Sequence, residues 1–164
     1  MKKLILILAA LIMIPVVAFA QVAVGGIVFV KSPVLFGDTV STVNANINQV
    51  CFGGDIRFKA NWLQLESVIV GAAGPVNGVD IFADAGVTFD LAMIRLSAGI
   101  GPNLSWNIQT QPIVQTGMNA KIGADVMLGD LSVGASYIMA LKYNDHVDIY
   151  NRSGLLGFQV MVWL

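Results

Sequence analysis

One stretch near the end of the chain combines the residue types of a hydrolytic site. His146, the only histidine, lies between Asp145 and Asp148, and Ser153 follows a few residues later. A histidine can activate a serine hydroxyl as a general base when a carboxylate orients its ring. Acidic and amide residues are also what any solvated loop contains, and no serine stands at a spacing typical of a catalytic site. We therefore expect a surface loop here and no catalytic residues.

Two further patterns that could bind a ligand are also weak. Asp145, His146 and Asp148 alternate as metal ligands could, but such alternation is common by chance. The glycine-rich segment 71–78 lacks the Lys-Ser/Thr of a phosphate-binding loop and is typical of a hairpin connection. Cys51 is expected to be a small buried filler, and a single cysteine forms no internal disulfide. The sequence predicts no metal site, no cofactor and no cofactor-binding residues.

The remaining residues that could take part in chemistry are charged, and they lie in segments where polar and apolar residues alternate. Nine of them alternate with apolar residues, and all nine occupy the face opposite the apolar one. Strict alternation over about ten residues indicates a strand with a different environment on each face. These charged residues are Asp55, Arg57, Lys59, Glu66, Asp80, Asp84, Arg95, Lys121 and Asp125.

Eight such strands are expected to position these charges. They lie near residues 22–31, 50–59, 63–69, 79–89, 92–100, 118–128, 131–139 and 156–164. Tight turns are predicted at Ala60-Asn61, Asp90-Leu91 and Gly129-Asp130, and longer connections join the other pairs. The first strand is apolar on both faces, so its facing is left open, and Gly25-Gly26 is predicted to mark a bulge.

The first twenty residues are predicted to be a cleaved signal peptide. Lys2 and Lys3 precede an apolar run, and Ala18-Phe19-Ala20 is a small-x-small cleavage site. The run is short for a membrane-spanning helix. Residues 1–20 are thus assigned to export, and residues 21–164 form one domain.

The composition of that domain favours a membrane barrel. The chain is 56% hydrophobic with a mean hydropathy of +0.76, yet residues 21–164 contain no apolar run near the roughly 18 residues that a spanning helix needs. Inside a bilayer all backbone polar groups must pair internally, which leaves a closed barrel. An outward Arg or Lys near the bilayer midplane costs roughly 2–4 kcal/mol, so the charged face is expected inside. The predicted fold is an all-β, eight-stranded, antiparallel, up-and-down transmembrane barrel.

The nine inward charges are expected to fill the lumen. Eight strands leave an interior just wide enough for side chains, and buried charges must pair. We therefore predict an ion-pair network. If Ala60-Asn61 centres its turn, Asp55 lies opposite Glu66 and needs a bridging cation, for which Arg57 and Arg95 are the candidates.

The domain resembles the small eight-stranded outer-membrane proteins, the OmpA-like and OmpX-like barrels. The resemblance covers essentially all of residues 21–164 and is architectural. Its most specific part is the C-terminal segment 157–164, which looks like the strand read by the barrel-assembly machinery. The family usually ends on an aromatic residue, whereas here the aromatic residue is penultimate, and no peptidoglycan-binding domain follows. The signal residues implied are Phe158, Val160, Val162, Trp163 and Leu164.

The sequence therefore predicts a structural or surface-interaction barrel in a Gram-negative-type outer membrane, with a small-solute or ion channel and a lipid-modifying enzyme as the alternatives. Its expected partners are outer-membrane lipid and, during biogenesis, the assembly machinery. Nine basic and ten acidic residues, less Lys2 and Lys3, leave a net charge of about −3 and no basic stripe, so no nucleic-acid partner is expected. A monomer is expected.

Overall fold

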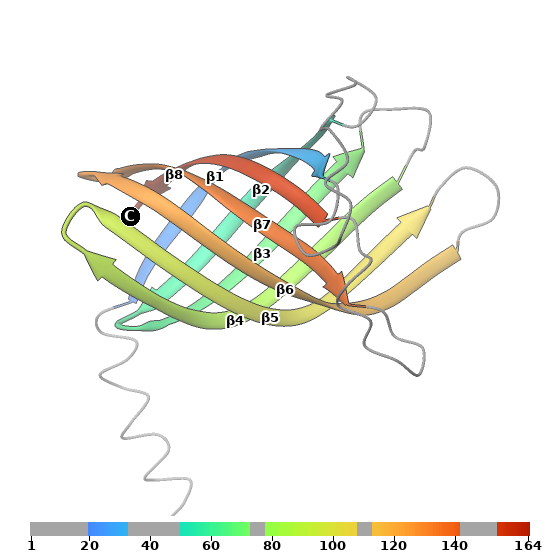
Figure 1. The fold of residues 1–164 in the computed structure, drawn as a ribbon, viewed down its shortest axis with the longest axis horizontal. Coiled ribbons are helices and arrows are strands. Elements are labelled where there is room, and N and C mark those ends of the chain that lie inside the picture. Colours follow the sequence, from blue (N-terminus) through green and yellow to red (C-terminus); the bar gives the residue numbers. More distant parts are fainter. Residues whose placement is uncertain (1–19, 33–49, 73–77, 108–112, 142–153) are drawn as a thin grey trace, which may run out of the picture.

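The structure is a computed structural model that describes residues 20–32, 50–72, 78–107, 113–141 and 154–164. These residues form a single closed barrel, seen from the side in Figure 1. The described part of the chain contains no helix of the length and apolarity needed to cross a membrane.

Eight antiparallel strands make up the barrel, and each pairs with its neighbour in the sequence. The first strand also pairs with the last, which closes the sheet without a free edge. The predicted fold class is confirmed. The strands are β1 (Ala20–Ser32), β2 (Val50–Ala60), β3 (Leu63–Ala72), β4 (Gly78–Leu91), β5 (Ile94–Asn107), β6 (Ile113–Leu128), β7 (Leu131–Leu141) and β8 (Gly154–Trp163).

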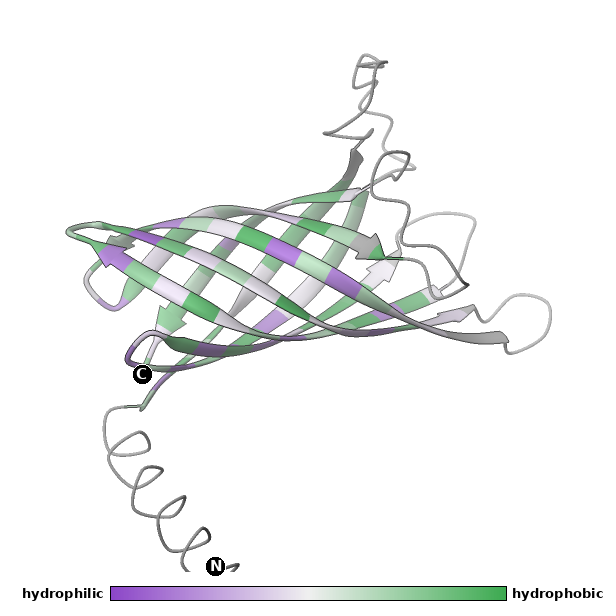
Figure 2. Cartoon of the chain, turned by 60° about the horizontal axis from the view of Figure 1, so that its bottom comes forward, coloured by the Kyte–Doolittle hydropathy of each residue, from purple (hydrophilic) through white to green (hydrophobic). Residues whose placement is uncertain are grey.

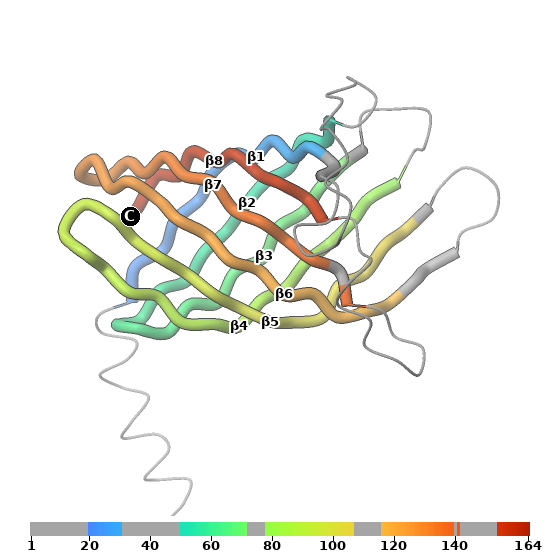
Figure 3. The backbone as a smooth tube through the Cα atoms, viewed as in Figure 1, coloured from blue at the N-terminus to red at the C-terminus, as the bar shows by residue number. Residues whose placement is uncertain are grey.

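Three two-residue turns lie at the end of the barrel that also holds the C-terminus (Figure 3). The third turn is at Gly129-Asp130, as predicted. The other two lie further along the chain than predicted, at Asn61-Trp62 and Ala92-Met93. Asn61, Ala92 and Gly129 have φ values of 58°, 54° and 71°. Because alanine has no preference for positive φ, the sequence carries no mark of the turn at Ala92.

Each tight turn is hydrogen-bonded to the next strand along the chain after its own hairpin. The Trp62 carbonyl accepts a hydrogen bond from the Thr88 amide, and the Met93 carbonyl accepts one from the Met127 amide. The Asp130 carbonyl accepts in the same way from the Trp163 amide, at 2.7 Å. These bonds satisfy one backbone carbonyl group in each turn.

The facing of β1, left open by its sequence, follows from its pairing with β2. Ile27 and Phe29 point into the barrel and are buried, whereas Val24 and Val28 point outward. The pairing runs unbroken through Gly25 and Gly26, so the predicted bulge is wrong. Gly25 faces inward opposite Asp55, where a Cβ atom would lie 2.0 Å from the Val160 carbonyl oxygen.

The outside of the barrel is apolar and the inside is charged. Green and purple segments alternate along the strands in Figure 2. Large apolar side chains such as Phe52, Leu65 and Phe89 are exposed by 57%, 61% and 60%. Seven of the nine charged residues that the alternation singled out are buried: Asp55, Arg57, Glu66, Asp84, Arg95, Lys121 and Asp125.

Candidate functional site

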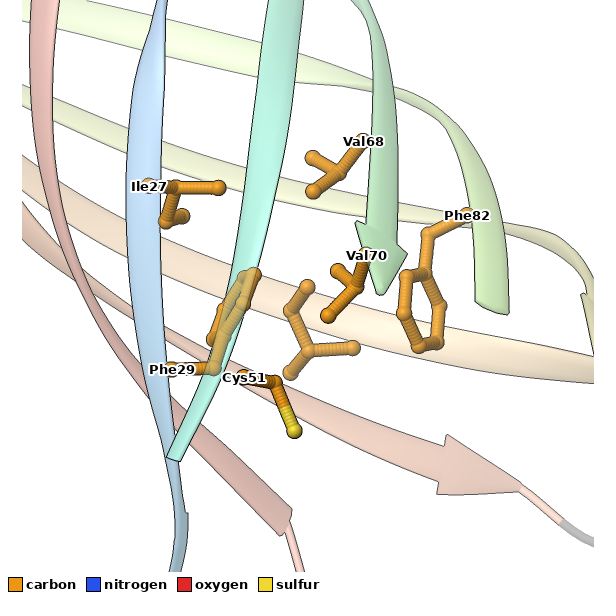
Figure 4. Close-up of a cluster of buried hydrophobic side chains, with 7 residues drawn as sticks. Ile27, Phe29, Cys51, Val68, Val70 and Phe82 are labelled. Carbon is orange, nitrogen blue, oxygen red and sulfur yellow. The ribbon is translucent and has the colours of Figure 1, made fainter. Parts of the chain in front are cut away.

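The lumen holds several groups of buried side chains, and an apolar layer lies towards the end of the long connections. This layer contains side chains from β1, β2, β3, β4 and β7, and six of its seven members are labelled in Figure 4. All are buried and in contact with one another: Ile27, Phe29, Cys51, Val68, Val70, Phe82 and Ile138. Burial of Cys51 in this layer agrees with its predicted role as a filler.

Below the apolar layer lies a charged layer organised around Arg57. Its guanidinium group contacts three carboxylates: Asp55 Oδ2 at 2.7 Å, Glu66 Oε1 at 2.9 Å and Asp125 Oδ2 at 2.8 Å. Arg57 is 1% exposed. Since a planar guanidinium group has five donors in a fixed fork, it can bridge carboxylates from β2, β3 and β6 at once.

Lys121 is the second cation of this layer. Its ammonium group donates a short hydrogen bond to Glu66 and lies 4.0 Å from Asp55 Oδ2. Two cations therefore stand between Asp55 and Glu66, whose like charges would otherwise destabilise the pair.

Amide side chains extend the charged layer around the barrel. Gln159 Nε2 donates to Asp125 Oδ1 at 2.7 Å, and Ser136 Oγ donates to Gln159 Oε1 at 3.1 Å. Asn119 Nδ2 donates to Asp84 Oδ1 at 2.5 Å. Asp84 has no ion-pair partner among the described residues.

A third group of side chains lies at the tight-turn end. Asp90 pairs with Arg95 at 2.7 Å and with Lys59 at 2.9 Å. The Arg95 guanidinium group lies 4.1 Å from the centre of the Trp163 ring, and the Trp163 indole N–H donates to Ser132 Oγ at 3.0 Å. Trp163 also packs with Ala23, Met161 and Met127. This end thus combines a partly exposed group of ion pairs around Asp90 with a small apolar cluster around Trp163.

Inward glycines make the space that the long charged side chains occupy. Gly134 is the clearest case, because a Cβ atom there would lie 2.1 Å from Asp125 Oδ1 and 2.5 Å from the Ala124 carbonyl oxygen. Asp125 can therefore reach Arg57 and Gln159 only if position 134 has no side chain.

One small cavity lies in the charged layer. A cavity of about 10 Å³ lies among residues of β3, β4, β5 and β6, which is room for about one water molecule. Its lining is formed by Gln64, Glu66, Asp84, Gly86, Ser97, Ala98, Gly99 and Lys121. A solute larger than water does not fit in this cavity.

Two details of the predicted network are wrong. The turn at Asn61-Trp62 pairs Arg57, and not Asp55, with Glu66 across β2 and β3. Arg57 does bridge the two carboxylates, but Arg95 lies on Asp90 and Trp163 instead, and Lys121 takes the second place. The first error follows from the turn, because moving the turn by one residue moves the cross-strand partner by two.

The remaining predicted lumen residues lie at the ends of the barrel. Lys59 is partly buried and belongs to the tight-turn end. Asp80 is also partly buried, near the start of β4. Asp145, His146, Asp148 and Ser153 lie outside the described residues. Within the described residues no three or more His, Cys, Asp or Glu side chains are grouped to hold a metal ion.

Several functional side chains were not singled out from the sequence. Gln159, Asn119 and Gln64 are uncharged, so charge alone could not reveal them, although each occupies an inward position of the alternation. Asp90 was placed in a turn and lies at the end of β4. Of the C-terminal residues, Trp163 points inward, whereas Phe158, Val160, Val162 and Leu164 are exposed.

Solved structures with a similar fold share the closed eight-stranded architecture. The N-terminal β-barrel domain of Pseudomonas aeruginosa OprF matches with a TM-score of 0.58 and 16% identity, over 88% of this chain and 97% of that one. Neisserial surface protein A matches with a TM-score of 0.50 and 17% identity, over 87% and 96%. The chain has the fold of eight-stranded outer-membrane β-barrels.

A third similar structure is Ail, the attachment invasion locus protein of Yersinia pestis, with a TM-score of 0.50 and 12% identity over 88% of this chain and 97% of that one. No protein-family model and no curated protein sequence matches the chain. At these identities the likeness concerns the fold, and the role of the barrel must be argued from its own residues.

Proposed function

We propose that this chain is an integral outer-membrane barrel with a structural or surface-interaction role. The observation that carries the proposal is the inverted distribution of polarity: large apolar side chains on the outside, and a buried ion-pair network inside. In water the exposed apolar surface would be unfavourable, whereas in a bilayer it contacts lipid tails. The predicted signal peptide at residues 1–20 supplies the export that this location requires.

The outward aromatic residues support the same placement. Phe58 and Trp62 lie near the tight turns, and Phe52 and Trp106 lie towards the long connections. Transmembrane barrels carry aromatic residues at both membrane interfaces, where a partly polar ring suits the boundary with the headgroups. The proposed bilayer therefore spans the strands between these two groups.

A surface role accounts for the filled lumen better than transport does. The buried apolar layer and the buried Arg57 network fill parts of the lumen with side chains, which argues against an open path for a solute. Two of the similar barrels are named as a surface protein and an attachment invasion locus protein, which makes contact with an external partner a reasonable role for this chain. The alternative of a small-solute channel is tested in planar bilayers, where we expect no discrete conductance steps.

The proposal extends to lipid and the barrel-assembly machinery as partners, and to a monomer. It includes neither a nucleic-acid partner nor catalysis. A lipid-modifying activity is the remaining alternative, and it depends on His146. We expect His146→Ala to leave the lipid composition of producing cells unchanged, and a loss of a lipid-hydrolysis product in that variant would contradict the proposal.

The decisive experiment is heat modification of the membrane-extracted protein. A closed barrel resists unfolding by detergent, so the unboiled sample should migrate differently from the boiled one on an SDS gel. Fractionation of the same cells should place the protein with outer-membrane lipid. Recovery in the soluble fraction, with no difference on boiling, would mean that the exposed apolar face does not contact a membrane.

A further inference from the structure

The small cavity in the charged layer has the features of a binding site. It lies between Gln64, Glu66, Asp84, Ser97 and Lys121, with the glycines of β4 and β5 forming one wall. Gln64 and Asp84 are each 5% exposed, so their polar atoms must be satisfied from within the protein or by something bound inside it.

Each of these two residues carries an oxygen that lacks a hydrogen-bond donor. Gln64 donates its Nε2 to Glu66 Oε2 at 3.2 Å, but its Oε1 has no partner among the described residues. Asp84 accepts from Asn119 at Oδ1, and its Oδ2 has no partner there either. The two residues that carry these oxygens both line the same water-sized space.

The charge of the layer decides between the possible occupants. Four buried carboxylates, Asp55, Glu66, Asp84 and Asp125, face three buried cations, Arg57, Lys121 and Arg95, and Arg95 is paired with Asp90. Around the cavity itself Glu66 and Asp84 exceed Lys121 by one negative charge. A water molecule could donate to both free oxygens, but it would leave this buried charge uncompensated, which is costly at low dielectric.

We propose that the cavity is a site for one small monovalent cation of the sodium class. Gln64 Oε1 and Asp84 Oδ2 are its proposed ligands, and both are hard oxygen donors of the kind that such ions prefer. A single excess negative charge and a volume of about 10 Å³ favour one monovalent ion over a hydrated divalent one. The site neutralises Asp84, the buried carboxylate without an ion-pair partner among the described residues.

The test is urea unfolding of the refolded barrel in uncharged detergent, with sodium chloride replaced stepwise by choline chloride at constant ionic strength. Choline is too large for the cavity and keeps electrostatic screening equal. We expect the unfolding midpoint to rise with sodium and to saturate. At a sodium concentration ten times its Kd, the unfolding equilibrium constant should fall about elevenfold. Equal midpoints in both salts would overturn the proposal in favour of a water or a proton.

Variants connect the effect to the cavity. Asp84→Asn removes the excess charge and Gln64→Met removes the amide oxygen, so each should abolish the difference between sodium and choline. Asp80→Asn is the matched control, because Asp80 lies on the same strand and does not line the cavity. A sodium effect that persists in folded Asp84→Asn would place the ion elsewhere and refute this site. Should that variant not fold, Gln64→Met and the wild-type comparison decide alone.

Discussion

Arg57 is the residue on which the charged layer depends most. It reaches three carboxylates from three strands while almost fully buried, and no other cation among the described residues pairs with all three. A buried ion pair gives little net stability against an apolar replacement of the whole set, but removing one partner leaves its opposite charges unpaired. The contribution of Arg57 to stability is therefore measured best by changing Arg57 alone.

We expect Arg57→Met to lower the free energy of unfolding by about 3–5 kcal/mol, since three buried carboxylates lose their shared cation. Urea unfolding in detergent measures this change. Lys59→Met is the matched control on the same strand, and because its ion pair with Asp90 is partly exposed, it should cost about 1 kcal/mol or less. Equal losses in the two variants would show that the network is not the source of the effect.

The same network predicts strong coupling between its members. Arg57→Met combined with Asp125→Asn should destabilise the barrel by less than the sum of the two single changes, because the second change removes a charge that the first left unpaired. Contacting residues of this kind couple by about 0.5–3 kcal/mol. A double-mutant cycle on unfolding free energies measures the coupling, and strict additivity would argue that Arg57 and Asp125 do not interact.

At the scale of elements, the alternation of residues predicted all eight strands and the side of each of the nine charges. It could not predict two turn positions, and these set the cross-strand partners. Asn61 and Ala92 adopt positive φ, and neither position holds a glycine that would have indicated the turn from the sequence. The hydrogen bonds of the uncharged members, such as Gln159 and Asn119, could not be predicted either. Only the strand register brings these side chains against Asp125 and Asp84.

The turns give a matched pair of substitutions. Gly129→Ala places a Cβ atom at a φ of 71° and should destabilise the barrel by about 1–2 kcal/mol. Ala92→Gly, at a φ of 54°, relieves the same strain and should leave the stability equal or slightly higher. Thermal or urea unfolding compares them. A large loss in Ala92→Gly would mean that the methyl group of Ala92 contributes packing that outweighs its backbone strain.

At the scale of the whole molecule, the three tryptophans can be used to test which face of the barrel contacts lipid in the proposed membrane. Trp62 and Trp106 are 54% and 46% exposed on the outside, and Trp163 is 7% exposed inside the tight-turn end. The same difference separates a membrane barrel from a soluble one, in which the apolar residues fill the interior.

We expect brominated lipid to quench the fluorescence of variants that retain only Trp62 or only Trp106, and to leave a variant that retains only Trp163 largely unquenched. The other two tryptophans are changed to phenylalanine in each case. Steady-state emission in vesicles of brominated and ordinary phosphatidylcholine provides the ratio. Strong quenching of Trp163 alone would invert the assignment of inside and outside.

The apolar layer at the long-connection end also bears on the movement of protons. A proton crosses a protein by passing along an unbroken chain of waters or hydroxyl and carboxyl groups, and the charged layer supplies such groups in plenty. The side chains of Phe29, Val70 and Phe82 have none. We therefore expect such a chain entering from the tight-turn end to stop at this layer, so that the proposed membrane barrel conducts no protons.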